Sequence, residues 1–162
     1  MAQEKTDKDK ISLRAEDVMV KEVITIDENS TVKQAADVMN QFEIGSIIAT
    51  RNGQAIGIIT ERDLLKRIVA AGKSARNVKV KDIMSSPLTA IMPNMDLEEA
   101  VRLMFEKKIK KLAVIDQNGV VGLLSLTDIA RCQPGITKLL RALSALQDTP
   151  KSLKKVLACY IV

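Results

Sequence analysis

The sequence contains no histidine among its 162 residues. Histidine is the commonest general base and a frequent metal ligand, so its absence argues against Ser-His or Cys-His catalysis and against a zinc hydrolase. Only three residues are aromatic (Phe42, Phe105 and Tyr160), which leaves almost no platform for stacking the bases of single-stranded nucleic acid. There is also no P-loop or paired-carboxylate motif. We therefore expect a protein that is not an enzyme, and we assign no catalytic residues.

Cysteine and long apolar runs are also scarce. Cys132 and Cys159 are too few for a disulfide framework and lack the spacing of a zinc site, so we assign no metal ligands. The longest apolar stretches are of strand length, far short of the roughly 18 residues that a membrane-spanning helix needs. No apolar segment follows the charged run at residues 1–10, which therefore does not resemble a signal peptide. These features predict a cytoplasmic protein with no membrane partner.

The composition is that of a globular protein with a sizeable core. Apolar residues make up 46% of the chain and charged residues 28%. The 25 basic and 20 acidic residues give a net charge of +5. This surplus suits a partner that carries phosphate groups, but it is modest for a dedicated DNA-binding protein.

The chain contains an internal repeat. A shift of 65 positions places residues 16–19 on residues 81–84, and it superposes Met39 on Met104 and Asp63 on Asp128. The hydrophobic character of the positions matches through most of each unit. Two copies are too few for a solenoid. The repeat therefore predicts a pseudo-twofold pair of units that share one interface.

Each unit has the same predicted order of elements. An extended run comes first, and a helix follows that begins at a capping residue, Thr31 or Asp96, with Gln or Glu three positions later. Two strand-like runs come next, separated by Asn-Gly, which is a strong hairpin signal. A second helix begins at Thr60 or Ser125. The predicted fold class is α/β (α+β), with two β-α-β-β-α repeats in a pseudo-twofold arrangement.

The repeat divides the chain into four parts. We expect a disordered charged arm at residues 1–12, the first repeat at 13–72 and the second at 78–133, with a polar, glycine-led linker between the repeats. Residues 134–162 form a C-terminal helical extension. Its apolar residues follow one helical stripe, namely Ile136, Leu139, Leu140, Leu143 and Leu146. We expect this helix to dock on its own module or on a second copy.

One motif occurs at equivalent positions in both repeats. Residues 57–63 and 122–128 share the pattern Gly-φ-φ-Thr/Ser-x-x-Asp, with φ apolar, which indicates a strand that runs into a helix N-terminus. Amides at such an end attract anions, and the Thr60 or Ser125 hydroxyl can donate a hydrogen bond to phosphate. The carboxylate one turn later can accept two hydrogen bonds from a ribose diol. The glycine allows a flat base to approach the backbone.

The same residues also fit a capping box that binds nothing. In a capping box the hydroxyl and the carboxylate satisfy backbone amides at the helix end. For one isolated match the cap is the better interpretation. Two equivalent matches favour a ligand site more strongly, although duplication alone copies a cap as well. The motif leaves both interpretations open.

The repeat and its motifs resemble the cystathionine β-synthase (CBS) domain, which occurs in tandem as a Bateman module. Residues 17–19, 44–48 and 82–84 support the resemblance, which covers about residues 13–133. It implies regulatory ligands, and no obligatory cofactor, in clefts between the repeats: AMP, ADP or ATP and, in some members, NAD or S-adenosylmethionine. It also implies a homodimer that senses the energy state.

The resemblance assigns ligand-binding residues. Asp63 and Asp128 match carboxylates that bind the ribose, and Thr60 and Ser125 match hydroxyls that face phosphates. The family holds adenine with the backbone of the first strand of each repeat. In this sequence that backbone corresponds to Thr25, Ile26, Ala90 and Ile91.

The resemblance also predicts two unequal sites. Lys110 matches a basic position that faces the ligand phosphates. Its counterpart in the first repeat is Gly45, which lacks the cation, and Arg62 is the nearest candidate to compensate.

These features predict a stand-alone regulatory module that binds adenine nucleotides between its repeats and signals to an unknown effector protein. Two alternatives remain. One is a homodimeric interaction scaffold with vestigial sites. The other is a basic protein associated with nucleic acid, for which a solvated surface is the simpler explanation of the charge.

Overall fold

The computed structural model of the chain describes residues 13–132, 137–145, 149–151 and 153–155. The predicted arm at residues 1–12 and parts of the C-terminal extension, including Ile136 and Leu146, lie outside the described residues. Within the described ranges, every helix is too short or too polar to cross a membrane.

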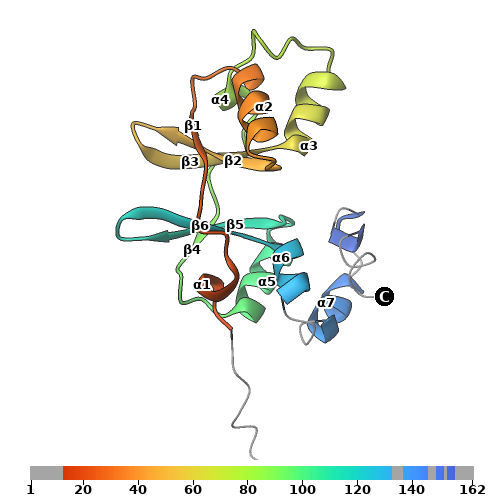
Figure 1. The fold of residues 1–162 in the computed structure, drawn as a ribbon. Helices are drawn as coiled ribbons and strands as arrows, with labels where there is room; N and C mark the ends of the chain where they lie inside the picture. Colours follow the sequence, from red (N-terminus) through yellow and green to blue (C-terminus); the bar gives the residue numbers. More distant parts are fainter. Residues whose placement is uncertain (1–12, 133–136, 146–148, 152, 156–162) are drawn as a thin grey trace, which may run out of the picture.

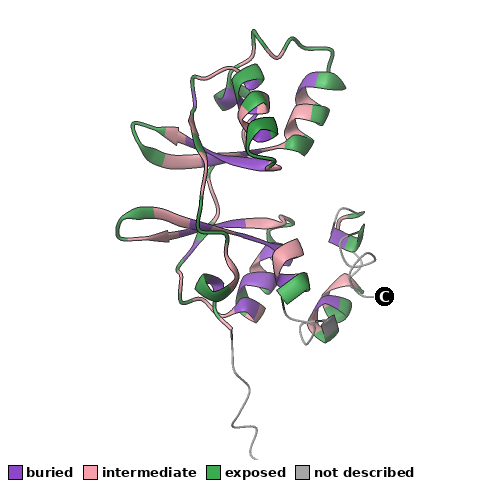
Figure 2. Ribbon diagram, viewed as in Figure 1, coloured by how far each residue is buried: buried purple, intermediate pink, exposed green. Residues whose placement is uncertain are grey.

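The first repeat forms a three-stranded sheet in the order β1-β2-β3. Its elements are β1 (Thr25–Asp27), α2 (Val32–Gln41), β2 (Ser46–Arg51), β3 (Gln54–Thr60), α3 (Glu61–Leu64) and the π-helical segment η1 (Leu65–Val69). β2 lies parallel to β1 and antiparallel to β3. This central strand is buried along residues 46–49 (Figure 2). A strand that is covered on both faces needs consecutive apolar residues, and residues 47–49 provide them.

The second repeat has the same architecture, in a sheet of order β4-β5-β6. Its elements are β4 (Ala90–Ile91), α5 (Leu97–Glu106), β5 (Lys111–Asp116), β6 (Gly119–Ser125) and α6 (Leu126–Cys132). β5 lies parallel to β4 and antiparallel to β6. The predicted pair of β-α-β-β-α repeats is therefore confirmed.

Local sequence signals explain where these elements begin and turn. Asn52 and Gly53 have φ values of 50° and 78°, as a type I′ hairpin turn requires. Thr31 caps α2 and forms the predicted capping box with Gln34. Asp96 caps α5 by accepting hydrogen bonds from the second and third amides of that helix.

Two one-turn helices are exchanged between the repeats. α1 (Ala15–Val18) and α4 (Val80–Ile83) form from the equivalent segments that precede each first strand. Ala15 belongs to the core of the second repeat, and Val80 belongs to the core of the first. Figure 1 shows α1 beside α5 and α4 beside α2. Each packed half therefore takes its one-turn helix from the segment that precedes the other repeat.

Backbone hydrogen bonds fix this exchange. Val20 and Leu123 exchange two bonds of 2.9 Å, and Ile58 and Ser85 exchange two bonds of 3.0 and 2.8 Å. Each pair joins the segment after an exchanged helix to the last strand of the repeat on which that helix packs. The backbone therefore sets the spacing between the connecting segments and the sheets.

The exchanged segments also explain the motif glycines. A Cβ on Gly122 would lie 2.2 Å from Sδ of Met19, and a Cβ on Gly57 would lie 2.8 Å from the backbone oxygen of Ser85 and 2.9 Å from Sδ of Met84. Real Cβ atoms do not approach other atoms this closely. The two glycines therefore make room for methionines from the exchanged segments, and not for the flat base that the sequence suggested.

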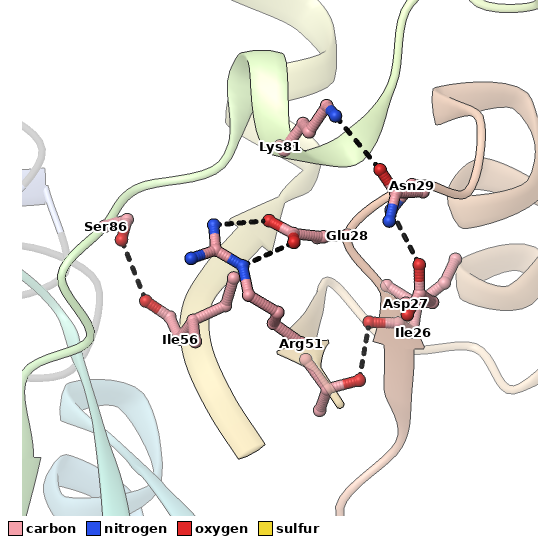
Figure 3. Close-up of polar contacts among 9 residues, drawn as sticks. Ile26, Asp27, Glu28, Asn29, Arg51, Ile56, Lys81 and Ser86 are labelled. Carbon is pink, nitrogen blue, oxygen red and sulfur yellow. Dashed lines mark hydrogen bonds and ion pairs between the residues drawn. The ribbon is translucent and has the colours of Figure 1, made fainter. Parts of the chain in front are cut away.

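Polar contacts hold α4 to the first repeat (Figure 3). The nearly buried Glu28 carboxylate accepts two hydrogen bonds from the Arg51 guanidinium, which lower the pKa of Glu28. The backbone oxygen of Glu28 accepts a bond of 2.9 Å from the amide of Lys81 in α4. Lys81 Nζ also donates to Asn29 Oδ1 at 3.0 Å. This cluster is part of the framework of the fold.

The C-terminal extension packs on the second repeat. α7 (Thr137–Ser144) contacts α5, and Leu140 and Leu153 are at most 1% exposed in the core of that repeat. Of the two surfaces expected for this helix, its own module is therefore the one on which it packs. Among the described residues, no comparable element covers η1, where Leu65 and Val69 are 62% and 69% exposed.

Candidate functional site

A cavity of about 680 Å³, here called cleft 1, lies between the two repeats. The start of α3 forms one wall, the connecting segment 84–89 forms another, and the loop at residues 108–111 closes it. Five residues predicted to bind a ligand meet in its lining, namely Gly45, Thr60, Arg62, Asp63 and Lys110. They come from both repeats, so only the folded pair creates this site.

A second cavity of about 420 Å³, here called cleft 2, is built from the equivalent elements. The start of α6 provides Ser125 and Asp128, and the connecting segment 20–24 and the loop at residues 43–46 complete the lining. Gly45 lines both cavities. The pseudo-twofold arrangement has therefore produced two clefts of the same design.

The predicted adenine-binding backbone lies outside both linings. Residues 25–26 and 90–91 form the regular strands β1 and β4, in which Thr25 pairs with Ile48 and Ala90 with Ala113. The residues just before these strands line the clefts, namely residues 23–24 in cleft 2 and residues 88–89 in cleft 1. The extended runs of the sequence contained the lining residues, but periodicity alone does not show where a run enters the sheet.

In cleft 1 the motif residues form a capping box. The backbone amide and the hydroxyl of Thr60 donate to Asp63 Oδ2 at 2.9 and 2.7 Å, and the amide of Asp63 donates to Thr60 Oγ1 at 3.3 Å. The other carboxylate oxygen of Asp63 lies 3.5 Å from Nε of Arg67. The cap is therefore real, and it holds the Asp63 carboxylate at the cavity wall.

Cleft 2 repeats this capping pair. The hydroxyl of Ser125 donates to Asp128 Oδ2, and the amide of Asp128 donates to Ser125 Oγ at 3.1 Å. Ser125 is only 7% exposed. Because both clefts contain the same pair, the cap alone does not distinguish one site from the other.

The charges of the two linings differ in sign. Among the described residues of cleft 1 five are basic, namely Arg62, Arg67, Lys108, Lys110 and Lys111, and two are acidic, namely Glu61 and Asp63. In cleft 2 two are basic, namely Lys111 and Arg131, and three are acidic, namely Glu22, Glu43 and Asp128. Cleft 1 thus has a surplus of three positive charges and cleft 2 a surplus of one negative charge.

Arg62 lies in cleft 1 together with Lys110. It does not line cleft 2, where Gly45 holds the position that corresponds to Lys110. The structure therefore does not place Arg62 where it could replace the missing cation.

The C-terminal extension adds a charge that sequence reasoning missed. Burial lowers the pKa of Lys110, and repulsion from Arg62 and from Lys155 lowers it further. Lys155 follows Leu153, which is fully buried in the core of the second repeat and anchors this part of the extension. The repeat pattern could not reveal Lys155, because the extension has no counterpart in the first repeat.

Within the described ranges, no group of three or more Cys, Asp or Glu side chains is arranged to hold a metal ion. The chemistry of cleft 1 is that of a cationic pocket with hydrogen-bonding groups at a helix start. Such a pocket can bind an anion and present a carboxylate to a neighbouring hydroxyl group.

Comparison with known proteins finds the same repeat elsewhere. The family model of the CBS domain matches residues 15–70 and again residues 80–135. The chain is 37% identical over 114 residues to the CBS domain-containing protein YhcV of Bacillus subtilis, a match that covers 70% of this chain and 81% of YhcV. Matches to two other curated relatives cover 64% and 52% of their lengths.

Two solved structures share the fold. The hexameric CBS-CP12 protein from bloom-forming cyanobacteria matches with a TM-score of 0.72 at 22% identity, over 93% of this chain and 98% of that one. The CBS domain pair of protein MJ0100, solved in complex with 5′-methylthioadenosine and S-adenosyl-L-methionine, matches with a TM-score of 0.67 at 24% identity, over 74% of this chain and 94% of that one. At these identities the likeness concerns the fold alone.

Proposed function

The chain belongs to the CBS domain family, as its repeat and motifs predicted, and we propose that it is a regulatory module that binds an adenine nucleotide in cleft 1. The charge of that cleft is the observation that supports this assignment most strongly. Five basic residues line this cavity between the repeats, and the phosphates of a nucleotide need cations. The MJ0100 pair, which was solved with two adenosine derivatives, supports the ligand class.

We propose a role for the residues of this lining towards each part of the nucleotide. Lys110 and Arg62 bind the phosphates, together with the hydroxyl of Thr60, which must give up its hydrogen bond to Asp63 to donate to a phosphate. Asp63 accepts hydrogen bonds from the ribose diol, for which its contact with Arg67 must loosen. The backbone at residues 88–89 faces the base.

A ligand panel tests this proposal. ATP, ADP, AMP, NAD and S-adenosylmethionine are added separately to the full chain, and thermal unfolding and calorimetry are recorded. A ligand at 100 times its dissociation constant stabilises the folded state by about 2.7 kcal/mol. We expect the phosphate-rich nucleotides to bind most tightly, because cleft 1 has a positive surplus. A panel without any shift or heat would refute the proposal and favour a scaffold with vestigial sites.

The nucleic-acid alternative predicts a different response. RNA or duplex DNA bound through phosphates must lose affinity steeply as salt rises. We expect neither to bind appreciably at moderate salt, since the net charge of +5 is modest and the basic residues of cleft 1 are grouped around one cavity.

We also propose a homodimer that signals to an effector protein. The exposed apolar side chains of Leu65 and Val69 mark a helical face of the first repeat that a second copy can cover. Light scattering across micromolar concentrations tests this, since a monomer has a mass of 17.8 kDa. A Leu65→Ser/Val69→Ser variant should shift the equilibrium towards the monomer.

A further inference from the structure

Lys111 lies on the wall between the two clefts. It is the first residue of β5, it pairs with Ser125 across the hairpin, and it is the only lysine common to both linings as described. Its counterpart in the first repeat is Ser46, a buried residue that lines cleft 2 alone. The second repeat therefore supplies an ammonium group where the first supplies only a hydroxyl.

The charge of Lys111 is influenced by one carboxylate from each cleft. Burial lowers the pKa of Lys111, Asp128 and Glu61 raise it, and repulsion from Lys110 lowers it. Asp128 belongs to cleft 2 and Glu61 to cleft 1. This partly buried cation, which lines both clefts, therefore interacts electrostatically with an acidic group from each of them.

We infer that Lys111 is a shared binding residue that makes anionic ligands in the two clefts compete. This inference rests on the proposed function, namely that cleft 1 takes a phosphate-bearing ligand. An anion in cleft 1 attracts the ammonium group and weakens its attraction to Asp128. Cleft 2, which is already acidic, then becomes a poorer site for a second anion but not for an uncharged nucleoside. Linkage requires the reverse effect to be equal in size.

The coupling is measured by titrating AMP or adenosine into the full chain, with and without saturating inorganic pyrophosphate, and by following resonances of cleft 2 residues. We expect pyrophosphate in cleft 1 to raise the dissociation constant of AMP at cleft 2 at least threefold. The dissociation constant of adenosine should change less than twofold.

Two lysine-to-methionine variants distinguish the effect of Lys111 from that of a neighbouring lysine. Lys111→Met removes the charge but keeps an unbranched side chain, and it should abolish the effect of pyrophosphate on AMP. Lys108→Met removes a charge that lines cleft 1 but not cleft 2, and it should preserve the effect.

A measurement on the free protein checks the shared contact without any ligand. Glu61→Gln and Asp128→Asn should each lower the pKa of Lys111, followed by NMR of its side chain, because each removes a carboxylate that stabilises the ammonium form. The Asn side chain keeps an oxygen that can accept the hydrogen bond from Ser125. If only one of the two variants changes this pKa, Lys111 serves a single cleft and the inference is wrong.

The outcomes separate this inference from the function on which it rests. If neither nucleotides nor pyrophosphate bind the wild-type chain, the proposed function fails and the coupling fails with it. If they bind but pyrophosphate leaves AMP affinity unchanged, or Lys111→Met retains the competition, the coupling alone is refuted.

Discussion

The two clefts share one backbone design and differ in charge, and the loop that precedes each central strand accounts for most of the difference. In cleft 1 this loop reads Lys108-Ile-Lys-Lys111, and in cleft 2 it reads Glu43-Ile-Gly-Ser46. Lys108 and Glu43 even share a left-handed backbone conformation, with φ values of 56° and 52°. The two loops therefore share this backbone conformation, while the side chains that line the clefts differ.

The framework explains why this divergence costs little stability. The cap, the exchanged helices and the bridges between segments use backbone groups, glycines and buried apolar residues. In the loops only Ile44 and Ile109 pack against the cores, and the charged side chains are not part of these contacts. Charge in the clefts can therefore change without a change of fold, and one duplicated site can specialise for phosphate while the other does not.

Exchanging the two loops is the strongest way to test this difference. A Lys108→Glu/Lys110→Gly/Lys111→Ser variant gives cleft 1 the loop of cleft 2. We expect ATP affinity to fall at least 100-fold, because about three charge-assisted contacts of roughly 1.5 kcal/mol each are lost. Calorimetry measures the affinity, and circular dichroism shows whether the fold persists.

One result of the loop exchange would contradict this prediction. The same four residue types already adopt this backbone in the first repeat, so the variant should remain folded. Undiminished ATP affinity in a folded variant would show that the phosphates do not lie against this loop.

Substitution of the capping carboxylates compares the clefts directly. Asp63→Ala should weaken ATP binding by about 1.5–3 kcal/mol, or roughly 10- to 150-fold, because hydrogen bonds to the ribose are lost. Asp128→Ala is the matched control, since it removes the same capping contact in cleft 2. It should leave ATP affinity within about threefold. Equal losses in both variants would mean that the nucleotide does not prefer cleft 1.

A smaller effect is expected from the extension. Lys155→Ala should lower ATP affinity about two- to fivefold, since an exposed charge that acts through space contributes less than about 1 kcal/mol. Lys154→Ala, one residue earlier and also exposed, is the control and should have no effect. An identical result for both variants would reduce the role of Lys155 to its contribution to net charge.

The smallest expected effect is the uptake of protons when ATP binds. The pKa of Lys110 is lowered in the free protein, chiefly by burial, and a bound phosphate favours the ammonium form and raises it again. At a pH between the pKa of Lys110 in the free protein and its pKa in the complex, binding takes up protons. ATP affinity should therefore fall as the pH rises towards the ordinary lysine pKa of about 10.4. Calorimetry in two buffers of different ionisation enthalpy measures the uptake. Lys110→Met should reduce it.

Local signals predicted the elements well. Capping residues such as Thr31, the Asn-Gly turns and the period of apolar residues depend on contacts within a few positions, so one sequence reveals them. The capping motif located Thr60 and Asp63, and the resemblance to the CBS family located Lys110; the fold brings all three together in cleft 1.

Features that depend on distant contacts were not predictable. Nothing in residues 15–19 shows that they pack on the second sheet, because the choice depends on which partner lies opposite in the folded pair. The presence of Lys111 in the linings of both clefts and the position of Lys155 also depend on such distant contacts. The resemblance predicted unequal sites from Lys110 and Gly45, but the net charge of each lining also depends on residues from both repeats that no local signal brings together.

The exchange of α1 and α4 has a consequence for how such a chain can arise and be divided. A single repeat would leave its own one-turn helix without a sheet to pack on. Two separate copies of a repeat would pack each helix on the other copy by the same exchange. Fusion of two such genes would therefore preserve a dimer that already existed. Conversely, a chain cut within residues 73–77 would yield fragments that each carry a helix of the other half. Such fragments should reassemble when mixed, and neither should fold well alone.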